Sequence, residues 1–330
     1  MRRASKLIAT CLVAGLTAFP GFAAATRTVD ATMTATMTNI PEGAAKIKVW
    51  VPLPRSTAAQ TIEAVEIISP YRWVRHSEPE FGNEYLFAEI DRPADGQELL
   101  ALSFRATRRE ITAATLEASV PSRRELRRNL RADRLASLSP RIRKLAADIT
   151  AGKTGRVEQA KAIYDYILLT MKYDKTNPGW GLGDAERACE IGTGNCTDFH
   201  SLFTSLARAR GIPARFVMGF PIPEGGTASS YHCWAEYYVR GRGWIPVDPS
   251  EASKSSDPAR RAYLFGNLDP DRIELTRGRD LELTPRTSEP LNYFIYPRLE
   301  VDGEEAGTSA VSVVFRDVPD QSDDGQTGTR

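Results

Sequence analysis

One cysteine of this 330-residue chain stands in a setting that suits a reactive thiol. Cys196 follows the glycine-rich residues 192–195 and precedes apolar residues at helical spacing, which predicts a helix that begins at the cysteine. The free N–H groups of a first helical turn stabilise an anion, so a thiol there has a lowered pKa. The Cys196 N–H is also placed to stabilise an oxyanion. The pattern favours nucleophilic attack on a carbonyl; the alternative is an inert, buried cysteine.

A nucleophilic thiol needs a base, and the chain has three histidines. His76 lies in a polar, loop-like stretch, and His200 projects along the same helix as the cysteine. His232 lies in an aromatic segment, residues 231–239, which predicts a strand, and residues 240–243 predict a hairpin turn. The return strand ends at Asp248, so His232 is the expected base and Asp248 the residue that orients its ring.

The register of this hairpin decides whether the two side chains meet. A two-residue turn at Gly241 and Arg242 would place Ala235 opposite Asp248, on the wrong face for His232. For His232 and Asp248 to face each other, we expect the pairing to centre on Arg240, a shift that a glycine-assisted bulge would supply.

Four sequence blocks in this region resemble the transglutaminase-like core. They are residues 194–198 (GNCTD), 211–215 (GIPAR), 232–236 (HCWAE) and 243–249 (GWIPVDP). The resemblance covers residues 139–251 well and extends more loosely downstream. It implies an α+β fold with a papain-like core, in which a helix bearing the cysteine packs on an antiparallel sheet bearing the histidine and the aspartate. By position it implies Cys196 as nucleophile, His232 as base and Asp248 as orienting residue.

The chemistry implied by this resemblance is acyl transfer or hydrolysis on protein or peptide amides through a Cys196 thioester. Water as acceptor would make the protein a cysteine peptidase or amidase, and an amine acceptor would make it a cross-linking acyltransferase. A third alternative is an exported protein that binds peptides without turnover. The expected partner is a protein or peptide, cell-wall peptides included. No cofactor is expected, and no calcium loop of the Asp-x-Asp-x-Asp-Gly type is present.

Aromatic and amide side chains near these blocks are further candidates for contacts with the substrate or its oxyanion. They are Trp180, Asn195 and Trp234, with Tyr173 as another residue that precedes the nucleophile.

The remaining cysteines leave two alternatives open. Cys189 and Cys233 either form a disulfide or are two separate, small buried residues. Cys233 is expected to point away from His232, because neighbouring residues of a strand alternate faces. A zinc site built from both of these cysteines with Cys196 and His200 would lack the close ligand pairs of known zinc sites, so no metal is expected.

The composition excludes several classes of protein. There are 43 Lys+Arg against 42 Asp+Glu, so the overall charge gives no reason to expect a nucleic-acid-binding protein. The chain is 42% hydrophobic and 26% charged, which is typical of a folded globular protein and not of a disordered one.

The N-terminus predicts export. Basic residues, the apolar residues 7–22 and a run of alanines predict a signal peptide over residues 1–25, and therefore a periplasmic or secreted protein. No other apolar run approaches the length of a membrane span, so none is expected after processing.

Periodicity divides the rest of the chain. Period-two alternation over residues 26–120 predicts an immunoglobulin-like β-sandwich. Residues 121–150 predict a helical linker, in which an arginine run without aromatic residues favours a solvated helix over a membrane or nucleic-acid surface. Ser139 and Pro140 predict the start of a helix that ends near Thr150.

Residues 151–316 predict the catalytic domain, which opens with a helix over residues 157–171. Strands at 263–265, 291–296 and 311–315 are expected to extend its sheet. Residues 317–330 are polar and predict a loose tail.

Overall fold

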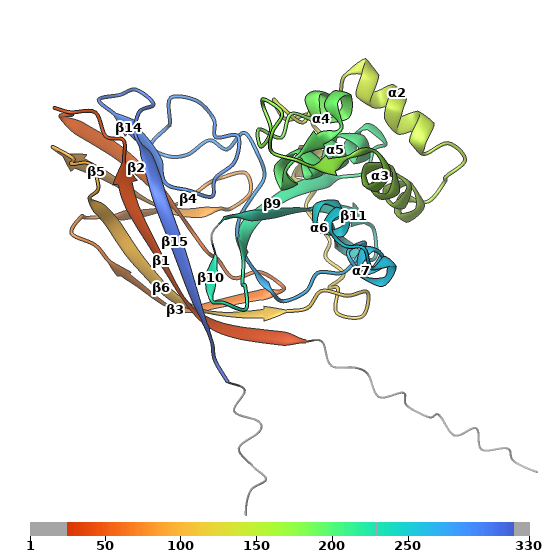
Figure 1. Cartoon of the computed structure of the whole chain (residues 1–330). Coiled ribbons are helices and arrows are strands. Elements are labelled where there is room, and N and C mark those ends of the chain that lie inside the picture. Colours follow the sequence, from red (N-terminus) through yellow and green to blue (C-terminus); the bar gives the residue numbers. More distant parts are fainter. Residues whose placement is uncertain (1–24, 229, 320–330) are drawn as a thin grey trace, which may run out of the picture.

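The computed structural model describes residues 25–228 and 230–319. Figure 1 shows a β-rich part, formed from both ends of the described chain, beside a part in which helices cover a sheet. The fold class is α+β, as expected, with several antiparallel sheets. Apart from Ala25, the expected signal peptide over residues 1–25 lies outside the described residues, as does the expected tail beyond residue 319.

Two antiparallel sheets form the β-rich part. Their strand orders are β10-β15-β1-β6-β3 and β14-β2-β5-β4. The N-terminal strands are β1 (Thr26–Thr38), β2 (Lys46–Leu53), β3 (Gln60–Ile68), β4 (Val74–Ser77), β5 (Glu84–Asp91) and β6 (Glu98–Arg109). The alternation in the sequence causes this arrangement: Val29, Ala31 and Met33 of β1 are buried, whereas the residues between them are more exposed.

Later strands of the chain return to these sheets. They are β10 (Thr227–Ala228), β14 (Arg298–Val301) and β15 (Thr308–Asp317). β15 pairs with β1 and β14 pairs with β2. The expectation that residues 311–315 extend the sheet of the predicted catalytic domain is therefore wrong, because β15 lies between β10 and β1 in a sheet of the β-rich part.

Two further strand expectations are also wrong. Residues 263–265 form no strand: Tyr263 ends helix α7 (Pro258–Tyr263), Leu264 is its C-cap, and only Phe265 joins the sheet, through an isolated bridge to Val247. Residues 291–296 form no strand; Leu291 joins Leu281 through an isolated bridge.

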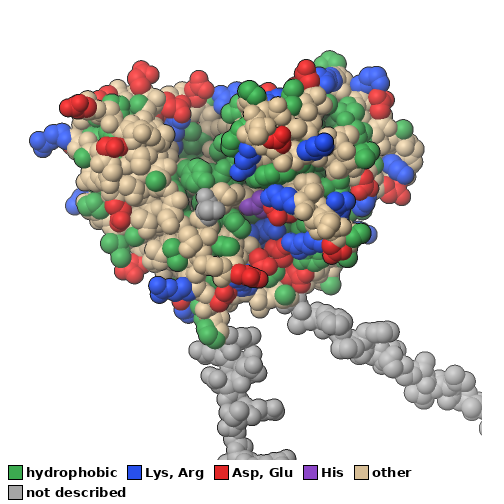
Figure 2. All heavy atoms as spheres, in the orientation of Figure 1, with side chains coloured by type: hydrophobic (Ala, Val, Ile, Leu, Met, Phe, Trp, Pro, Cys, Tyr) green, Lys and Arg blue, Asp and Glu red, His purple; other side chains and the backbone are tan. Residues whose placement is uncertain are grey.

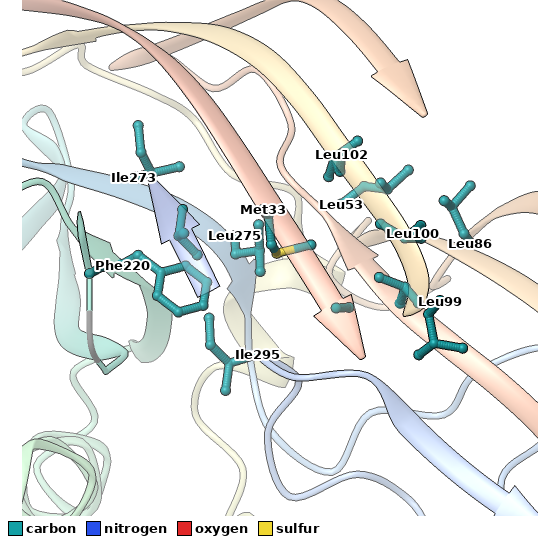
Figure 3. Close-up of a cluster of buried hydrophobic side chains, with 14 of the residues drawn as sticks. Met33, Leu53, Leu86, Leu99, Leu100, Leu102, Phe220, Ile273, Leu275 and Ile295 are labelled. Carbon is teal, nitrogen blue, oxygen red and sulfur yellow. The ribbon is translucent and has the colours of Figure 1, made fainter. Parts of the chain in front are cut away.

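The hydrophobic core runs from the β-rich part into the second part. Figure 3 shows side chains of β1, β6 and β13 (Arg272–Arg277) in one cluster, with Phe220 and Ile295 beside them. Met33 of β1 and Leu275 of β13 are each about 2% exposed. Because burying such side chains is the main favourable contribution to folding, this shared core holds the sheet that contains β13 against the β-rich part.

The second part is a four-stranded antiparallel sheet with helices packed on it. Its order is β12-β11-β9-β13, with β9 (Ala214–Pro221), β11 (His232–Val239) and β12 (Gly243–Val247). Helix α5 (Cys196–Ala209) lies against β11 and is buried throughout residues 196–208. Around it pack α2 (Pro140–Ile149), α3 (Arg156–Thr170), α4 (Ala185–Ile191) and α6 (Pro249–Lys254), and a short pair β7 (Lys172–Tyr173) and β8 (Thr193–Gly194) precedes it.

The helix starts follow the signals in the sequence. The Ser139 hydroxyl accepts a hydrogen bond from the Ile142 N–H at 3.1 Å, and α2 begins at Pro140, as predicted. The helices expected from residue 157 and from Cys196 are confirmed as α3 and α5. The arginine run forms only the short helix α1 (Arg123–Arg128), which has no buried residue.

Candidate active site

Cys196 is the first residue of helix α5, at the end of a tightly bonded loop. Asn195 caps the helix: its Oδ1 accepts the Thr197 N–H at 2.9 Å. The Asp198 carboxylate reaches back to the Asn195 N–H at 2.9 Å, which completes a capping box. These bonds place Cys196 at the positive end of the α5 dipole, where the sequence predicts it.

Asp198 also holds the loop that precedes α4. Its two carboxylate oxygens accept the N–H groups of Gly181 at 2.7 Å and Gly183 at 3.1 Å. A side chain at Gly194 would place Cβ 2.3 Å from Asp198 Oδ2, so this position needs glycine for close approach. Gly194 is therefore required by the packing around Asp198.

The β11–β12 hairpin sets the phase of the site. Ala235 lies opposite Val247, so the pairing centres on Gly241. The expectation that it must centre on Arg240 is wrong, and so is the two-residue turn. Gly241 has a φ of +79°, a left-handed conformation that glycine adopts readily. This conformation allows a turn of three residues centred on Gly241, which differs both from the two-residue turn and from the pairing centred on Arg240.

This register brings Asp248 to the face of His232. Continued by one residue, it sets Asp248 beside Trp234, which shares a strand face with His232. Asp248 leaves the strand there and caps helix α6, with its Oδ1 accepting the Glu251 N–H at 3.0 Å. The carboxylate therefore reaches His232 diagonally instead of from the directly opposite position.

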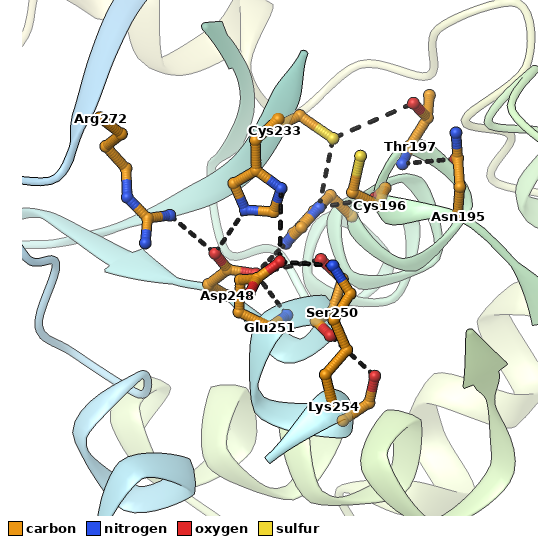
Figure 4. Close-up of polar contacts among 12 residues, drawn as sticks. Asn195, Cys196, Thr197, Cys233, Asp248, Ser250, Glu251, Lys254 and Arg272 are labelled. Carbon is orange, nitrogen blue, oxygen red and sulfur yellow. Dashed lines mark hydrogen bonds and ion pairs between the residues drawn. The ribbon is translucent and has the colours of Figure 1, made fainter. Parts of the chain in front are cut away.

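Cys196, His232 and Asp248 come together at this point (Figure 4). His232 Nε2 lies 2.7 Å from Asp248 Oδ2. The His232 ring lowers the pKa of the Cys196 thiol through a hydrogen bond, and His232 Nδ1 also lies 3.7 Å from Glu251 Oε1. The three residues are 2%, 7% and 0% exposed.

Asp248 has two further neighbours, Arg272 and His200, whose contacts with it the sequence did not predict. Arg272 of β13 donates from Nη1 to Asp248 Oδ2 at 2.7 Å, and His200 Nε2 lies 3.3 Å from Oδ1. The alternating sequence of β13, charged at 272 and 274, is typical of a strand with one solvent face, yet both residues are buried. For the placement of Asp248, the sequence offers one local signal beyond the hairpin: Asp248 is the N-cap residue of α6.

These contacts favour a thiolate and an imidazolium. Burial opposes the charge on His232, but the charge and hydrogen bond of Asp248 outweigh it and raise the pKa of His232 to about 9. Burial likewise opposes ionisation of Asp248, yet His232, His200 and Arg272 hold its pKa well below the usual range. The raised pKa of His232 and the lowered pKa of Asp248 both favour an ion pair between the two side chains.

The pKa of Cys196 is held well below its usual range. The first cause is a hydrogen bond from the Cys233 thiol; burial acts in the opposite direction, and the His232 hydrogen bond and charge follow. The pKa of Cys233 is raised well above its usual range, chiefly by burial and then by Cys196, so Cys233 keeps its proton and donates it.

The cysteines of the described residues are free thiols. Cys189 and Cys233 form no disulfide, so of the two alternatives the structure has separate thiols, one partly and one fully buried. Cys233 Sγ lies 3.5 Å from His200 Nδ1 of α5. Within residues 25–228 and 230–319, no group of three or more His, Cys, Asp or Glu side chains is arranged to hold a metal ion.

A cavity of about 300 Å³ opens beside His232. Its walls include Tyr173, Tyr231, Glu251 and Lys254. Figure 2 shows histidine atoms in a hollow between the two parts, with basic side chains close by. The cavity offers a substrate a route from the surface to the imidazole.

The further candidates differ in their positions. The Tyr173 hydroxyl accepts a hydrogen bond from the Cys196 N–H, and the Asn195 amide donates to the Tyr231 hydroxyl at 3.0 Å. Trp180 is 40% exposed on the loop before α4. Trp234 is buried and lines a second cavity that does not include His232, so its position speaks against a substrate contact at the thiol.

No helix in the described part of the chain is long and apolar enough to cross a membrane.

Two bacterial proteins are similar to this chain over different lengths. An uncharacterized protein of Haemophilus influenzae is 27% identical over 309 residues, covering 80% of this chain and 84% of that protein. A protein-glutamine gamma-glutamyltransferase of Pseudomonas aeruginosa is 35% identical over 66 residues, which are 18% of this chain and 10% of that protein.

A solved structure is similar over most of the chain. A proposed cysteine protease from Cytophaga hutchinsonii has a TM-score of 0.60, with 90% of this chain and 92% of that chain covered, at 16% identity; this likeness shows the fold alone. The family model of the transglutaminase-like superfamily matches residues 143–249, the region that contains the helix α5 and the β11–β12 hairpin. Residues 143–249 of this chain are therefore a transglutaminase-like superfamily domain.

Proposed function

We propose that this protein is a cysteine enzyme that transfers or hydrolyses acyl groups of protein or peptide amides through a Cys196 thioester. The observation that carries the proposal is the contact of the Cys196 thiol with His232, whose far nitrogen lies 2.7 Å from Asp248. In this proposal Cys196 is the nucleophile and His232 is the acid and base. Asp248 orients the His232 ring, and its negative charge favours the protonated form of that ring.

The first half-reaction forms the thioester. The Cys196 thiolate attacks the amide carbon, and the carbonyl oxygen takes up the electron pair as an oxyanion. When the oxyanion collapses, the C–N bond breaks and the His232 imidazolium gives its proton to the leaving nitrogen. The raised pKa of His232 supports this order, because the ring is already protonated when the amide arrives.

The oxyanion needs donors in addition to the α5 dipole. The Cys196 N–H is one, and the Tyr173 hydroxyl, which now accepts that N–H, lies at the same place. Burial, and then the charge of Cys196, raises the pKa of Tyr173, so the phenol keeps its proton. A substrate oxygen that takes the Cys196 N–H from the phenol would receive the Tyr173 O–H as its second donor.

The second half-reaction decides the activity. His232, now neutral, removes a proton from water or from an amine as either attacks the thioester, and Cys196 leaves as the thiolate. The name of the Pseudomonas aeruginosa relative motivates a glutamine side chain as the first substrate to test, and that of the Cytophaga hutchinsonii protein motivates hydrolysis.

The finer features of the fold and location belong to the same proposal. They are a papain-like arrangement of α5 on its sheet, an immunoglobulin-like arrangement of the N-terminal sheets, and export of the chain by residues 1–25.

Alkylation of the thiol tests the proposal directly. The mature protein is treated with iodoacetamide between pH 5 and 10, and the rate at Cys196 is followed by peptide mass spectrometry, which separates it from Cys189 and Cys233. Because the pKa of Cys196 is lowered, we expect alkylation well below pH 8.5, the range of a free thiol. In His232→Ala the profile should move toward that of a free thiol.

Turnover separates the reactions. A glutamine-containing peptide is incubated with and without an added primary amine, and deamidation, peptide cleavage and amine incorporation are measured, with Cys196→Ser as the control. An ordinary free-thiol profile in the wild type, together with no thioester on any amide, would overturn the proposal of a cysteine enzyme.

A further inference from the structure

A second cavity, of about 340 Å³, lies between the β-rich part and the catalytic sheet. Its walls come from the segment before β3, from the end of β6, from residues 111–125 and from β9, β11, β12 and β13. The cavity beside His232 shares none of these lining residues within the described chain. The second cavity is therefore separate from the proposed active site.

Arg108 is the side chain that makes this cavity unusual. The even-numbered residues of β6 from Leu100 to Ala106 face the core, and Arg108 continues that face at 1% exposure. Its Nε and Nη2 have no acceptor among the described residues, and it forms no ion pair there within 4 Å. Burial lowers the pKa of Arg108 to about 10, so the guanidinium stays charged near neutral pH.

The buried carboxylates nearby each have an arginine at ion-pair distance, although Glu274 Oε1 makes no hydrogen bond in the described chain. Glu274 lies 2.6 Å from Arg277 Nε, and Glu236 lies 2.6 Å from Arg215 Nη2. Counted over the whole lining, five arginines face four glutamates, which leaves one positive charge without a counter-charge. A buried charge without a partner is costly, so this arrangement suits a ligand that brings one negative charge.

The other unpartnered groups and the apolar walls specify the ligand further. Trp234 Nε1 and Arg55 Nε are also buried donors without an acceptor in the described chain. Apolar surface comes from Trp234, Trp244 and Leu268. A donor-rich end and an aromatic wall together match a small molecule with an acidic group on an apolar body.

We propose that the cavity at Arg108 binds a small organic carboxylate with an apolar or aromatic body. The carboxylate accepts from the Arg108 fork and from Trp234 Nε1, and the body packs against the two indole rings. The site is independent of the thiol chemistry, because its ligand touches neither Cys196 nor His232.

Thermal denaturation and titration calorimetry test the site with phenylacetate, indole-3-acetate and hexanoate as probes. A ligand that binds the native state raises Tm with its concentration. We expect at least one of the three to raise the Tm of the wild type at millimolar concentration, and its neutral amide to have no effect. A wild-type Tm that none of the three carboxylates raises overturns the proposal.

Two matched substitutions on β6 locate the effect. Arg108→Met removes the unpaired charge and keeps an unbranched stem, so the variant should be more stable than wild type without probe. Its affinity for the probe should fall about tenfold or more, since it loses a charged hydrogen-bonding partner. Arg105→Met, on the exposed face of the same strand, should bind the probe as wild type does.

The remaining outcomes are also decisive. Equal affinities of wild type and Arg108→Met for the probe overturn the assignment to Arg108. Stabilisation by inorganic phosphate equal to that by the carboxylates overturns the amphipathic ligand. If Arg108→Met fails to fold, Trp234→Phe serves instead: it keeps the ring but loses the N–H, and unchanged affinity in that variant overturns the carboxylate contact.

Discussion

Replacing Asp248 by asparagine removes one negative charge from the proposed active site and changes its shape little. Asparagine is as good an N-cap as aspartate, so the hydrogen bond to the Glu251 N–H that begins α6 should persist. Arg272 keeps its other partner, Asp269, at 3.1 Å. The variant should therefore fold and report on the charge of Asp248.

The size of the effect follows from His232. Its pKa is raised from 6.5 to about 9, although burial alone would lower it, and the charge of Asp248 is the largest cause of the rise. At about 1.4 kcal/mol for each pKa unit, this corresponds to about 3 kcal/mol in favour of the imidazolium. Without that charge, the ring is neutral at pH 7 and the thiol loses its cationic partner. We expect amide turnover to fall about 100-fold or more.

The assay compares three proteins. Wild type, Asp248→Asn and Asp269→Asn are alkylated with iodoacetamide across pH and assayed on a glutamine-containing peptide. Asp269→Asn is the matched control, because it removes a carboxylate from the same arginine and leaves the contact of His232 with Asp248. If Asp248→Asn alkylates and turns over within a few-fold of wild type, the charge of Asp248 has no role in activating the thiol.

Three other outcomes follow from the same geometry. Tyr173→Phe keeps the ring but removes the proposed second oxyanion donor, so kcat should fall about 100-fold while the alkylation profile of Cys196 changes little. Gly194→Ala should lower the free energy of unfolding by about 1–3 kcal/mol in urea titrations, because its Cβ would lie 2.3 Å from Asp198 Oδ2. His232 has a raised pKa, so its contribution to stability is full below pH 6.5 and is lost as the pH rises through about 9. Thermal melts of wild type should show this alkaline decline, and melts of His232→Gln should show less of it.

The parts of the site that sequence could predict are those with local causes. The helix start at Cys196 follows from a glycine-rich loop, an N-cap asparagine and apolar periodicity, all within a few residues. The hairpin was predictable as an element, but its register was not. The pairing centre depends on a three-residue turn around Gly241, and turn length sets which residues face each other.

The parts that failed depend on partners distant in sequence. Residues 311–315 read correctly as a strand, but alternation does not say which sheet the strand joins, and β15 pairs with β1 at the other end of the chain. In β13, Arg272 and Glu274 have the alternation of a solvent-facing strand side. Arg272 is buried because it packs against Asp248 and Asp269, and Glu274 is buried because Gln60 and Arg55 lie against it; no local pattern reveals these distant partners.

Asp248 shows how these local and distant causes depend on each other. A buried carboxylate normally loses its charge, because burial favours the neutral acid. Asp248 keeps its charge because His232 from its own hairpin, His200 from α5 and Arg272 from β13 converge on it. The hairpin and helix that carry the nucleophile and the base therefore do not complete the site alone. Arg272 reaches Asp248 only when β13 is in place, and Gln60 of β3 fastens β13 by accepting the Glu274 N–H at 2.8 Å. A chain of contacts therefore runs from Gln60 of the β-rich part through β13 and Arg272 to Asp248.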